Sequence, residues 1–130
     1  MSTKAIFAGA FTALSIFFST AALAQTDLTM WYHGAGNVEE RKILAGIIED
    51  FNSSQSDWRV SLQEFPQSAY NESVTAAALS NKLPDILDVD GPNMPNWAWS
   101  GYLQPLRIDE AKLENFLPGA VGKWGDKLYS

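Results

Sequence analysis

Leu28-Thr29-Met30-Trp31-Tyr32 decides the fold of this chain, because it is a short apolar run of β-prone residues. Such a run is typical of a parallel strand that is covered on both faces. Asn37, with Glu40 three residues later, has the pattern of a helix cap, and residues 58–65 alternate as a second strand. Together these segments predict one β-α-β unit. The helix between the strands carries apolar residues at helical spacing, namely Leu44, Ile47, Ile48 and Phe51.

The rest of the mature chain continues this alternation. The further predicted elements are a helix near 70–80, a strand over 85–90, a short aromatic helix over 94–100, a turn over 101–106, a helix near 109–116 and a strand opening at 127–129. The helix near 70–80 is expected to bury Tyr70, Val74, Ala77 and Ala78. Strands that alternate with helices at this spacing predict an α/β domain with a mostly parallel sheet.

Composition and charge exclude several classes of function. The chain has 130 residues, and nine Lys and Arg against fifteen Asp and Glu give a net charge of -6. An acidic surface repels phosphate backbones, so no nucleic-acid partner is expected. The absence of cysteine excludes thiolate metal sites, and the single histidine, His33, excludes a His-His metal pair. We therefore expect neither a metal nor a cofactor.

The first 24 residues have the features of a cleavable signal peptide. Lys4 precedes an apolar run over residues 5–18, and Ala22-Leu23-Ala24 is a small-residue cleavage site. Gly9, Thr12 and Ser15 interrupt the apolar run, which argues against a membrane span. No cysteine stands at the cleavage point to carry a lipid anchor. The sequence predicts a protein released into the periplasm, with residues 25–130 as its mature part.

Aromatic and polar residues gather where the predicted strands end, which is where open parallel sheets bind ligands. Flat aromatic faces can cover an apolar face of a ligand, and carboxylates or amides can take its polar groups. Asp90 and Asn93 stand just before Trp97 and Trp99, and Phe65 ends the second strand. Residues two apart in a short helix point in different directions, so one tryptophan is expected in the core. All five are candidate ligand-binding residues.

Four segments of the chain resemble a known family. They are residues 28–36, the helix end Phe51-Asn52, residues 76–86 with Leu83-Pro84-Asp85-Ile86, and Gly101-Tyr102-Leu103-Gln104-Pro105-Leu106. In this order and spacing they resemble the extracellular solute-binding proteins of ABC importers, above all the sugar-binding group that includes maltose-binding protein.

The resemblance implies a type II periplasmic-binding-protein-like fold in which two lobes hold a sugar and deliver it to a membrane permease. Residues 25–130 are then expected to be a partial N-terminal lobe. In this family the loop after the first strand contacts the ligand, which by position implies His33, Gly34 and Asn37. No covalent chemistry is implied.

Two other classes of site are weighed against binding. A secreted glycoside hydrolase is the alternative, with Asp90 paired to Asp88 or Glu64 as its two carboxylates. No G-x-S-x-G nucleophile motif accompanies His33. The residues from Gly34 to Gly36 lack the third glycine of a dinucleotide fingerprint, and two acidic residues follow them. A phosphate ligand is therefore disfavoured.

Overall fold

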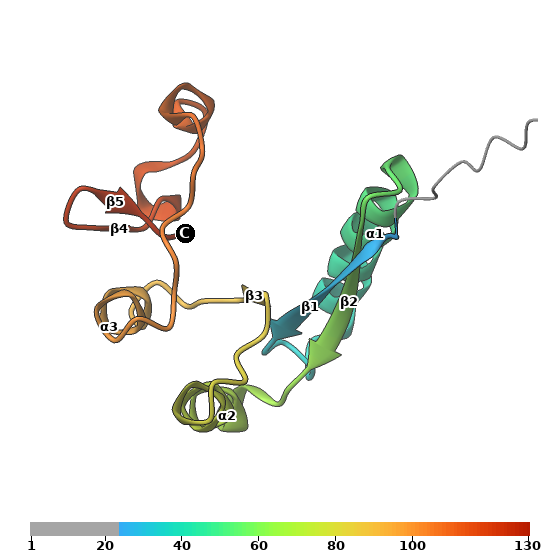
Figure 1. Ribbon diagram of the computed structural model, residues 1–130, viewed down its shortest axis with the longest axis horizontal. Coiled ribbons are helices and arrows are strands. Elements are labelled where there is room, and N and C mark those ends of the chain that lie inside the picture. The colour runs from blue at the N-terminus through green and yellow to red at the C-terminus, as the bar shows by residue number, and fades with distance from the viewer. Residues whose placement is uncertain (1–23) are drawn as a thin grey trace, which may run out of the picture.

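The computed structural model describes residues 24–130, so residues 1–23 of the predicted signal peptide lie outside the described residues. The elements follow one another as β1 (Thr26–Tyr32), α1 (Val38–Ser54), β2 (Trp58–Glu64), α2 (Gln67–Leu79), β3 (Ile86–Leu87) and α3 (Met94–Trp99). Two 3-10 helices (Glu110–Leu113 and Pro118–Ala120) and the hairpin β4 (Lys123–Trp124) and β5 (Lys127–Leu128) follow (Figure 1). No helix among these residues has the length and apolar composition that crossing a membrane requires.

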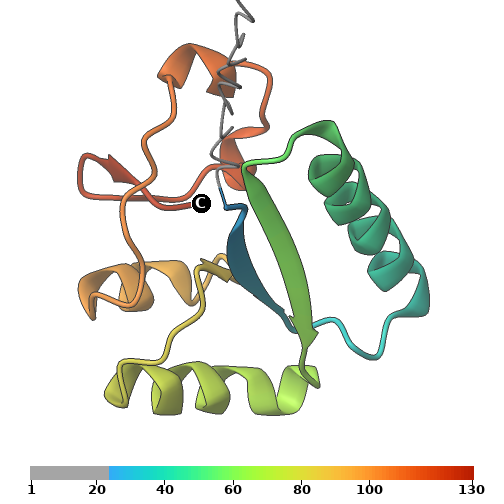
Figure 2. The same cartoon turned by 45° about the vertical axis from the view of Figure 1, so that its right-hand side comes forward.

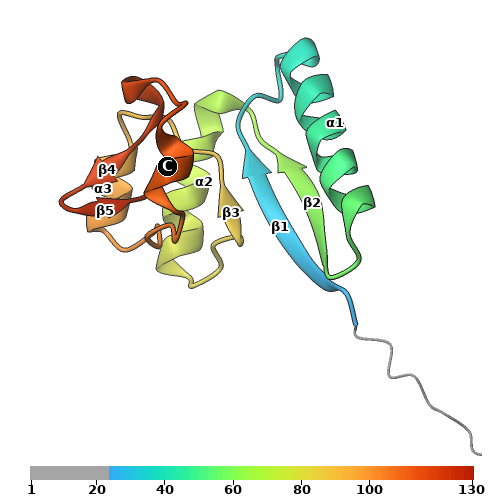
Figure 3. The ribbon, with the colours of Figure 1, turned by 90° about the horizontal axis from the view of Figure 1, so that it is seen from above.

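Three parallel strands form the main sheet, in the order β2-β1-β3. β1 pairs with β2 along its whole length, from Thr26 opposite Trp58 to Tyr32 opposite Glu64. β1 pairs with β3 only at Met30 and Trp31. Helix α1 lies on one side of the sheet, and α2 and α3 lie on the other (Figure 3). This arrangement confirms the predicted α/β class with a mostly parallel sheet.

Helix α1 begins where the sequence predicts. The Asn37 side-chain oxygen accepts a hydrogen bond from the Glu40 backbone N–H at 3.2 Å, and its amide nitrogen donates to the Glu40 carboxylate at 2.9 Å. The predicted apolar face is only half covered: Leu44 and Ile48 are partly buried, whereas Ile47 is 60% exposed and Phe51 is 41% exposed. The sheet has only three strands, and on this side the row formed by Leu44 and Ile48, one helical turn apart, packs toward it.

The end of α1 is joined to the outer edge of β2 by two side-chain amides. Asn52 accepts from the Val60 N–H at 2.8 Å and donates to the Val60 carbonyl at 2.9 Å. Gln55 accepts from the Trp58 N–H at 2.8 Å and donates to the Trp58 carbonyl at 2.7 Å. These bonds satisfy backbone groups that have no partner strand on this side.

We expect Asn52→Ala to lower the free energy of unfolding by about 1 kcal/mol, because the Val60 N–H and C=O lose their partners at a partly buried position. Asn71→Ala on α2 is the matched control, since it brings the same gain in helix propensity and removes only a 3.4 Å contact to Asn93. Chemical denaturation of the two variants measures the difference. Equal stabilities would show that the paired amide contributes nothing.

The core lies between α2, α3 and the sheet. Tyr70, Val74 and Trp97 are its buried centre. Ala77 is buried beside them, as expected for the helix near 70–80, whereas Ala78 is only partly buried. Helix α2 begins at Gln67, three residues before Tyr70, directly after the N-cap residue Pro66, whose backbone is extended at φ -60 and ψ 136. Partly buried side chains surround this centre, namely Trp31, Phe65, Leu83, Leu87, Val89, Tyr102 and Leu103.

The turn after α3 is confirmed and has a definite geometry. Gly101 has φ +76, its N–H donates to the Ala98 carbonyl, and the Tyr102 N–H donates to the Trp97 carbonyl. This pair of bonds is the Schellman motif, in which a glycine takes the left-handed conformation just after the helix. The turn directs residues 102–106 back along β3.

Three predicted elements differ in the structure. β3 covers Ile86–Leu87 rather than 85–90, because β1 ends at Tyr32 and leaves the later residues without a partner strand. The predicted helix near 109–116 is only a 3-10 helix over Glu110–Leu113, capped by Asp109. The strand at 127–129 exists as β5, but it pairs antiparallel with β4 across the tight turn at Gly125 and does not join the main sheet.

Candidate functional site

A cavity of about 540 Å³ lies at the carboxyl ends of β1 and β2. Three of its lining residues, His33, Gly34 and Asn37, are those that the family resemblance implies. The rest of the wall comes from the start of α1 and the start of α2, with Gly36, Glu40, Pro66, Gln67 and Ser68. Amide, carboxylate and hydroxyl groups thus face one space at the edge where parallel sheets bind ligands.

Gly34 is required in this wall. A Cβ placed there would clash with the Tyr32 phenol, which lies against the Gly34 backbone. Tyr32 itself is buried, and this burial, together with the neighbouring Glu40, raises the pKa of its hydroxyl. The phenol therefore stays neutral at physiological pH, and it packs behind Gly34 at the end of β1.

His33 joins the cavity to the end of β3. Its Nε2 atom lies 3.2 Å from the Asp88 Oδ2 and 3.3 Å from the Asp90 Oδ1. The imidazole is only 15% exposed, whereas the Asp90 side chain is 45% exposed. The Nε2 atom carries a single N–H, so the two carboxylates share one donor, and each keeps lone pairs for other donors. A sugar hydroxyl is a donor of the required kind.

Tyr70 holds the two strand ends together beneath this cluster. Its hydroxyl lies 2.8 Å from the Asp88 carbonyl oxygen and 3.2 Å from the Trp31 carbonyl oxygen. Its ring lies 5.1 Å from the His33 ring and 5.8 Å from the Phe65 ring, measured between centroids. Burial raises the pKa of Tyr70 far above its ordinary value, so the hydroxyl remains a donor at any physiological pH.

Arg41 is the cation nearest to the start of α1, and it is already paired. Its guanidinium lies 2.8 Å from the Glu64 carboxylate at the end of β2. Glu40 lines the cavity, and Asp88 and Asp90 lie beside it. The edge is therefore acidic, which fits a neutral polar ligand better than an anion.

The remaining predicted site residues do not line this cavity. The Phe65 ring packs 4.6 Å from the Trp31 ring, and Asn93 approaches Asn71 at 3.4 Å. Trp97 is 4% exposed and belongs to the core, while Trp99 is 75% exposed, so the two tryptophans do point in different directions.

Glu40, Gln67 and Ser68 line the cavity but were not among the predicted site residues. The sequence signal at Glu40 was its capping pattern, which explains its place at the start of α1 equally well. Gln67 and Ser68 follow the second strand directly, and this position alone was the signal that could have found them. For these two residues, their position after the end of a strand was a better predictor of a place in the cavity wall than their residue type.

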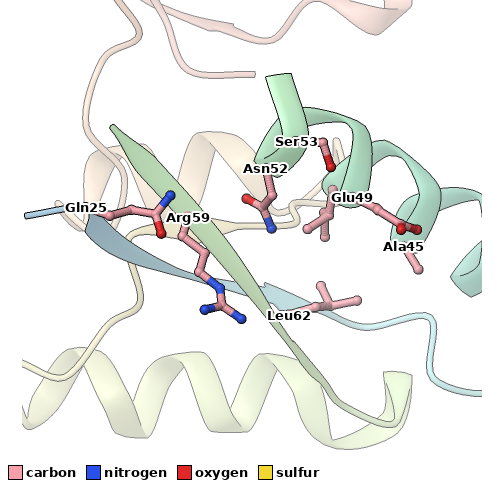
Figure 4. Close-up of a pocket in the computed structure, with 8 residues that line it drawn as sticks. Gln25, Ala45, Glu49, Asn52, Ser53, Arg59 and Leu62 are labelled. Atoms are coloured by element: carbon pink, nitrogen blue, oxygen red, sulfur yellow. The ribbon is translucent and has the colours of Figure 1, made fainter. Parts of the chain in front are cut away.

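Other hollows lie elsewhere on the described residues, among them one of about 380 Å³ on α2 around Asn71 and Leu79. A second, of about 450 Å³, sits between the last turns of α1 and β2, with Glu49, Asn52 and Arg59 in its wall (Figure 4). A third, of about 610 Å³, runs beside β3, against the segment from Tyr102 to Arg107. None of these three lies at the joined carboxyl ends of β1 and β2. In residues 24–130 no group of three or more acidic, histidine or cysteine side chains is placed to hold a metal ion.

No protein-family model matches the chain, and no curated protein matches it. Among solved structures it is similar to the sugar-binding protein MalE from the phytopathogen Xanthomonas citri, with a TM-score of 0.62 and 22% sequence identity. The match covers 80% of this chain and 27% of that one, so the chain spans about a quarter of the length of the MalE structure. The described residues have a type II periplasmic-binding-protein-like α/β fold, in part.

Proposed function

We propose that this chain is part of the first lobe of a periplasmic solute-binding protein that holds a sugar between two lobes. The observation that carries the proposal is the cluster of His33, Asp88 and Asp90 beside a polar cavity, at the carboxyl edge of a sheet whose fold is shared with a sugar-binding protein. The predicted signal peptide supports export. Closure of a second lobe over this edge then sequesters the sugar, and a membrane permease of an ABC importer accepts it from the closed form.

The groups at the edge suit the hydroxyls of a sugar. Asp90 is half exposed and offers charged acceptor oxygens, while Asn37, Gln67 and Ser68 offer both donors and acceptors around the cavity. Stacking on the apolar face of the sugar ring falls to Trp99, because Trp97 is enclosed in the core. The binding role of Asn93 rests on its place just before α3.

The pairings among the acidic groups favour binding over hydrolysis. Glu64 is held by Arg41, and Asp88 and Asp90 share one imidazole nitrogen. A glycosidase needs two carboxyl groups that are free to act on the scissile bond, whereas each of these carboxylates is already engaged by a neighbouring side chain. Capture without chemistry is therefore the function that this geometry supports best.

Calorimetric titration of the full-length protein with a panel of neutral oligosaccharides tests the proposal. We expect saturable binding to at least one sugar, followed by chromatographic recovery of that sugar unchanged. A matched titration with the corresponding uronic acid is expected to show weaker binding, because the edge is acidic. Hydrolysis of the recovered sugar would favour the glycosidase, and absence of binding across the panel would reject a sugar as the ligand.

A further inference from the structure

We infer that Tyr70 is the residue that positions the proposed ligand-binding groups, an inference that rests on the proposed sugar-binding function. Tyr70 is 2% exposed and therefore does not itself reach a ligand. Yet it contacts every segment that carries a candidate site residue. Helix α2 starts close to the carboxyl end of β2 (Figure 2). From its first turns the Tyr70 hydroxyl reaches the Trp31 carbonyl near the end of β1.

The hydroxyl of Tyr70 supplies a bond that the sheet lacks at this point. β3 stops at Leu87, and after it only the Asp88 N–H bonds to the Trp31 carbonyl, at 2.9 Å. The Asp88 carbonyl oxygen is then left without a strand partner, and the Tyr70 hydroxyl binds it at 2.8 Å. The same oxygen atom of Tyr70 reaches the Trp31 carbonyl at 3.2 Å. The phenol thus clamps the segment that carries Asp88 and Asp90 to the end of β1.

The ring of Tyr70 fixes the other partner in this cluster. It lies against the His33 ring at 5.1 Å, the Phe65 ring at 5.8 Å and the Trp97 ring at 6.2 Å. The imidazole is therefore packed from below by Tyr70 and bonded from the side by the two carboxylates. One side chain sets the relative place of His33 and of the backbone that bears its acidic partners.

Ordered binding groups raise affinity because less conformational freedom is lost when the ligand binds. Tyr70→Phe keeps the ring and removes only the hydroxyl. In this variant the segment after β3 gains freedom, and we expect the Kd for the sugar bound by the wild-type protein to rise about tenfold. Tyr102→Phe is the matched control, because Tyr102 also packs on the core but lies in the groove beside β3, away from the site.

Titration calorimetry and NMR of wild type, Tyr70→Phe and Tyr102→Phe in the full-length protein test the inference. His33 is the single histidine in residues 1–130. Its imidazole signals are assigned as those that disappear from the spectrum of a His33→Gln variant of the full-length protein. We expect these signals to move in Tyr70→Phe and to stay in place in Tyr102→Phe. We also expect a slowly exchanging Tyr70 hydroxyl proton in the wild type, a measurement that needs no variant.

Failure of the proposed sugar-binding function and failure of the positioning role of Tyr70 give different results. If the wild-type protein binds none of the sugars, the proposed function is wrong. If the wild type binds but Tyr70→Phe binds equally well, or if Tyr102→Phe loses the same affinity, the positioning role is wrong and the sugar site stands. A Tyr70 hydroxyl proton in fast exchange with water would also contradict the clamp, even if the variant failed to fold.

Discussion

Trp97→Ala is expected to lower the free energy of unfolding by about 3–5 kcal/mol, which is the usual cost of removing a large aromatic side chain from a packed core. Trp97 is 4% exposed, and its ring lies 6.2 Å from that of Tyr70 within the buried centre that also contains Val74. Guanidinium denaturation followed by circular dichroism measures the loss.

Trp99→Ala is the matched control, two residues further along the same helix and 75% exposed. Its effect on the free energy of unfolding is expected to stay within about 0.5 kcal/mol. Because stacking on the sugar is assigned to Trp99 in the proposed function, the same variant is expected to lose binding affinity while its stability is unchanged. Equal destabilisation by the two substitutions would contradict the placement of Trp97 in the core.

Asp90→Asn is expected to weaken sugar binding about tenfold or more. A charged acceptor bonded to a neutral donor contributes about 1.5–3 kcal/mol, and Asn offers only a neutral oxygen in its place. Asp90 is the more exposed of the two carboxylates at His33, and so the better placed for ligand hydroxyls. Titration calorimetry of the variant against the sugar that the wild type binds gives the change in Kd.

Asp50→Asn on the solvent face of α1 serves as the control, since it makes the same charge change away from the cavity. Asp88 is unsuitable as a control, because it contacts the same His33 nitrogen as Asp90. The predicted strand over 85–90 would have placed Asp88 further from the ligand-binding edge than Asp90. Equal losses of affinity in the Asp90 and Asp50 variants would mean that the effect is one of overall charge. The assignment of Asp90 to the site would then fail.

The β1-α1-β2-α2 part of the fold was predictable because its signals are local. The cap at Asn37 depends on Glu40, three residues later, and the strand around Val60 is marked by the alternation of its own residues. The length of β3 was not predictable in this way, since a strand ends where its partner ends and that partner, β1, lies more than fifty residues earlier. The short helix at Glu110–Leu113 differs for a similar reason, because a helical pattern persists only where tertiary packing supports it.

The site was predictable only in part. Its location followed from the topology of parallel sheets, and His33, Gly34 and Asn37 from the family resemblance. Tyr70 was identified as a core residue from its spacing, which is correct for its ring. That its hydroxyl meets the Asp88 carbonyl depends on where the chain turns away after β3, and no pattern along the sequence specifies that angle.

The amides of Asn52 and Gln55 have a consequence for how molecules of this protein meet one another. An open strand edge is a template on which a strand of another molecule adds, and extended growth of this kind leads to aggregation. Two of the outward-facing residues of β2, Trp58 and Val60, already have both their N–H and C=O groups occupied by side chains of the same molecule. A foreign strand that approached β2 would have to displace four intramolecular bonds before it formed its own, so the sheet is protected against self-association on that side.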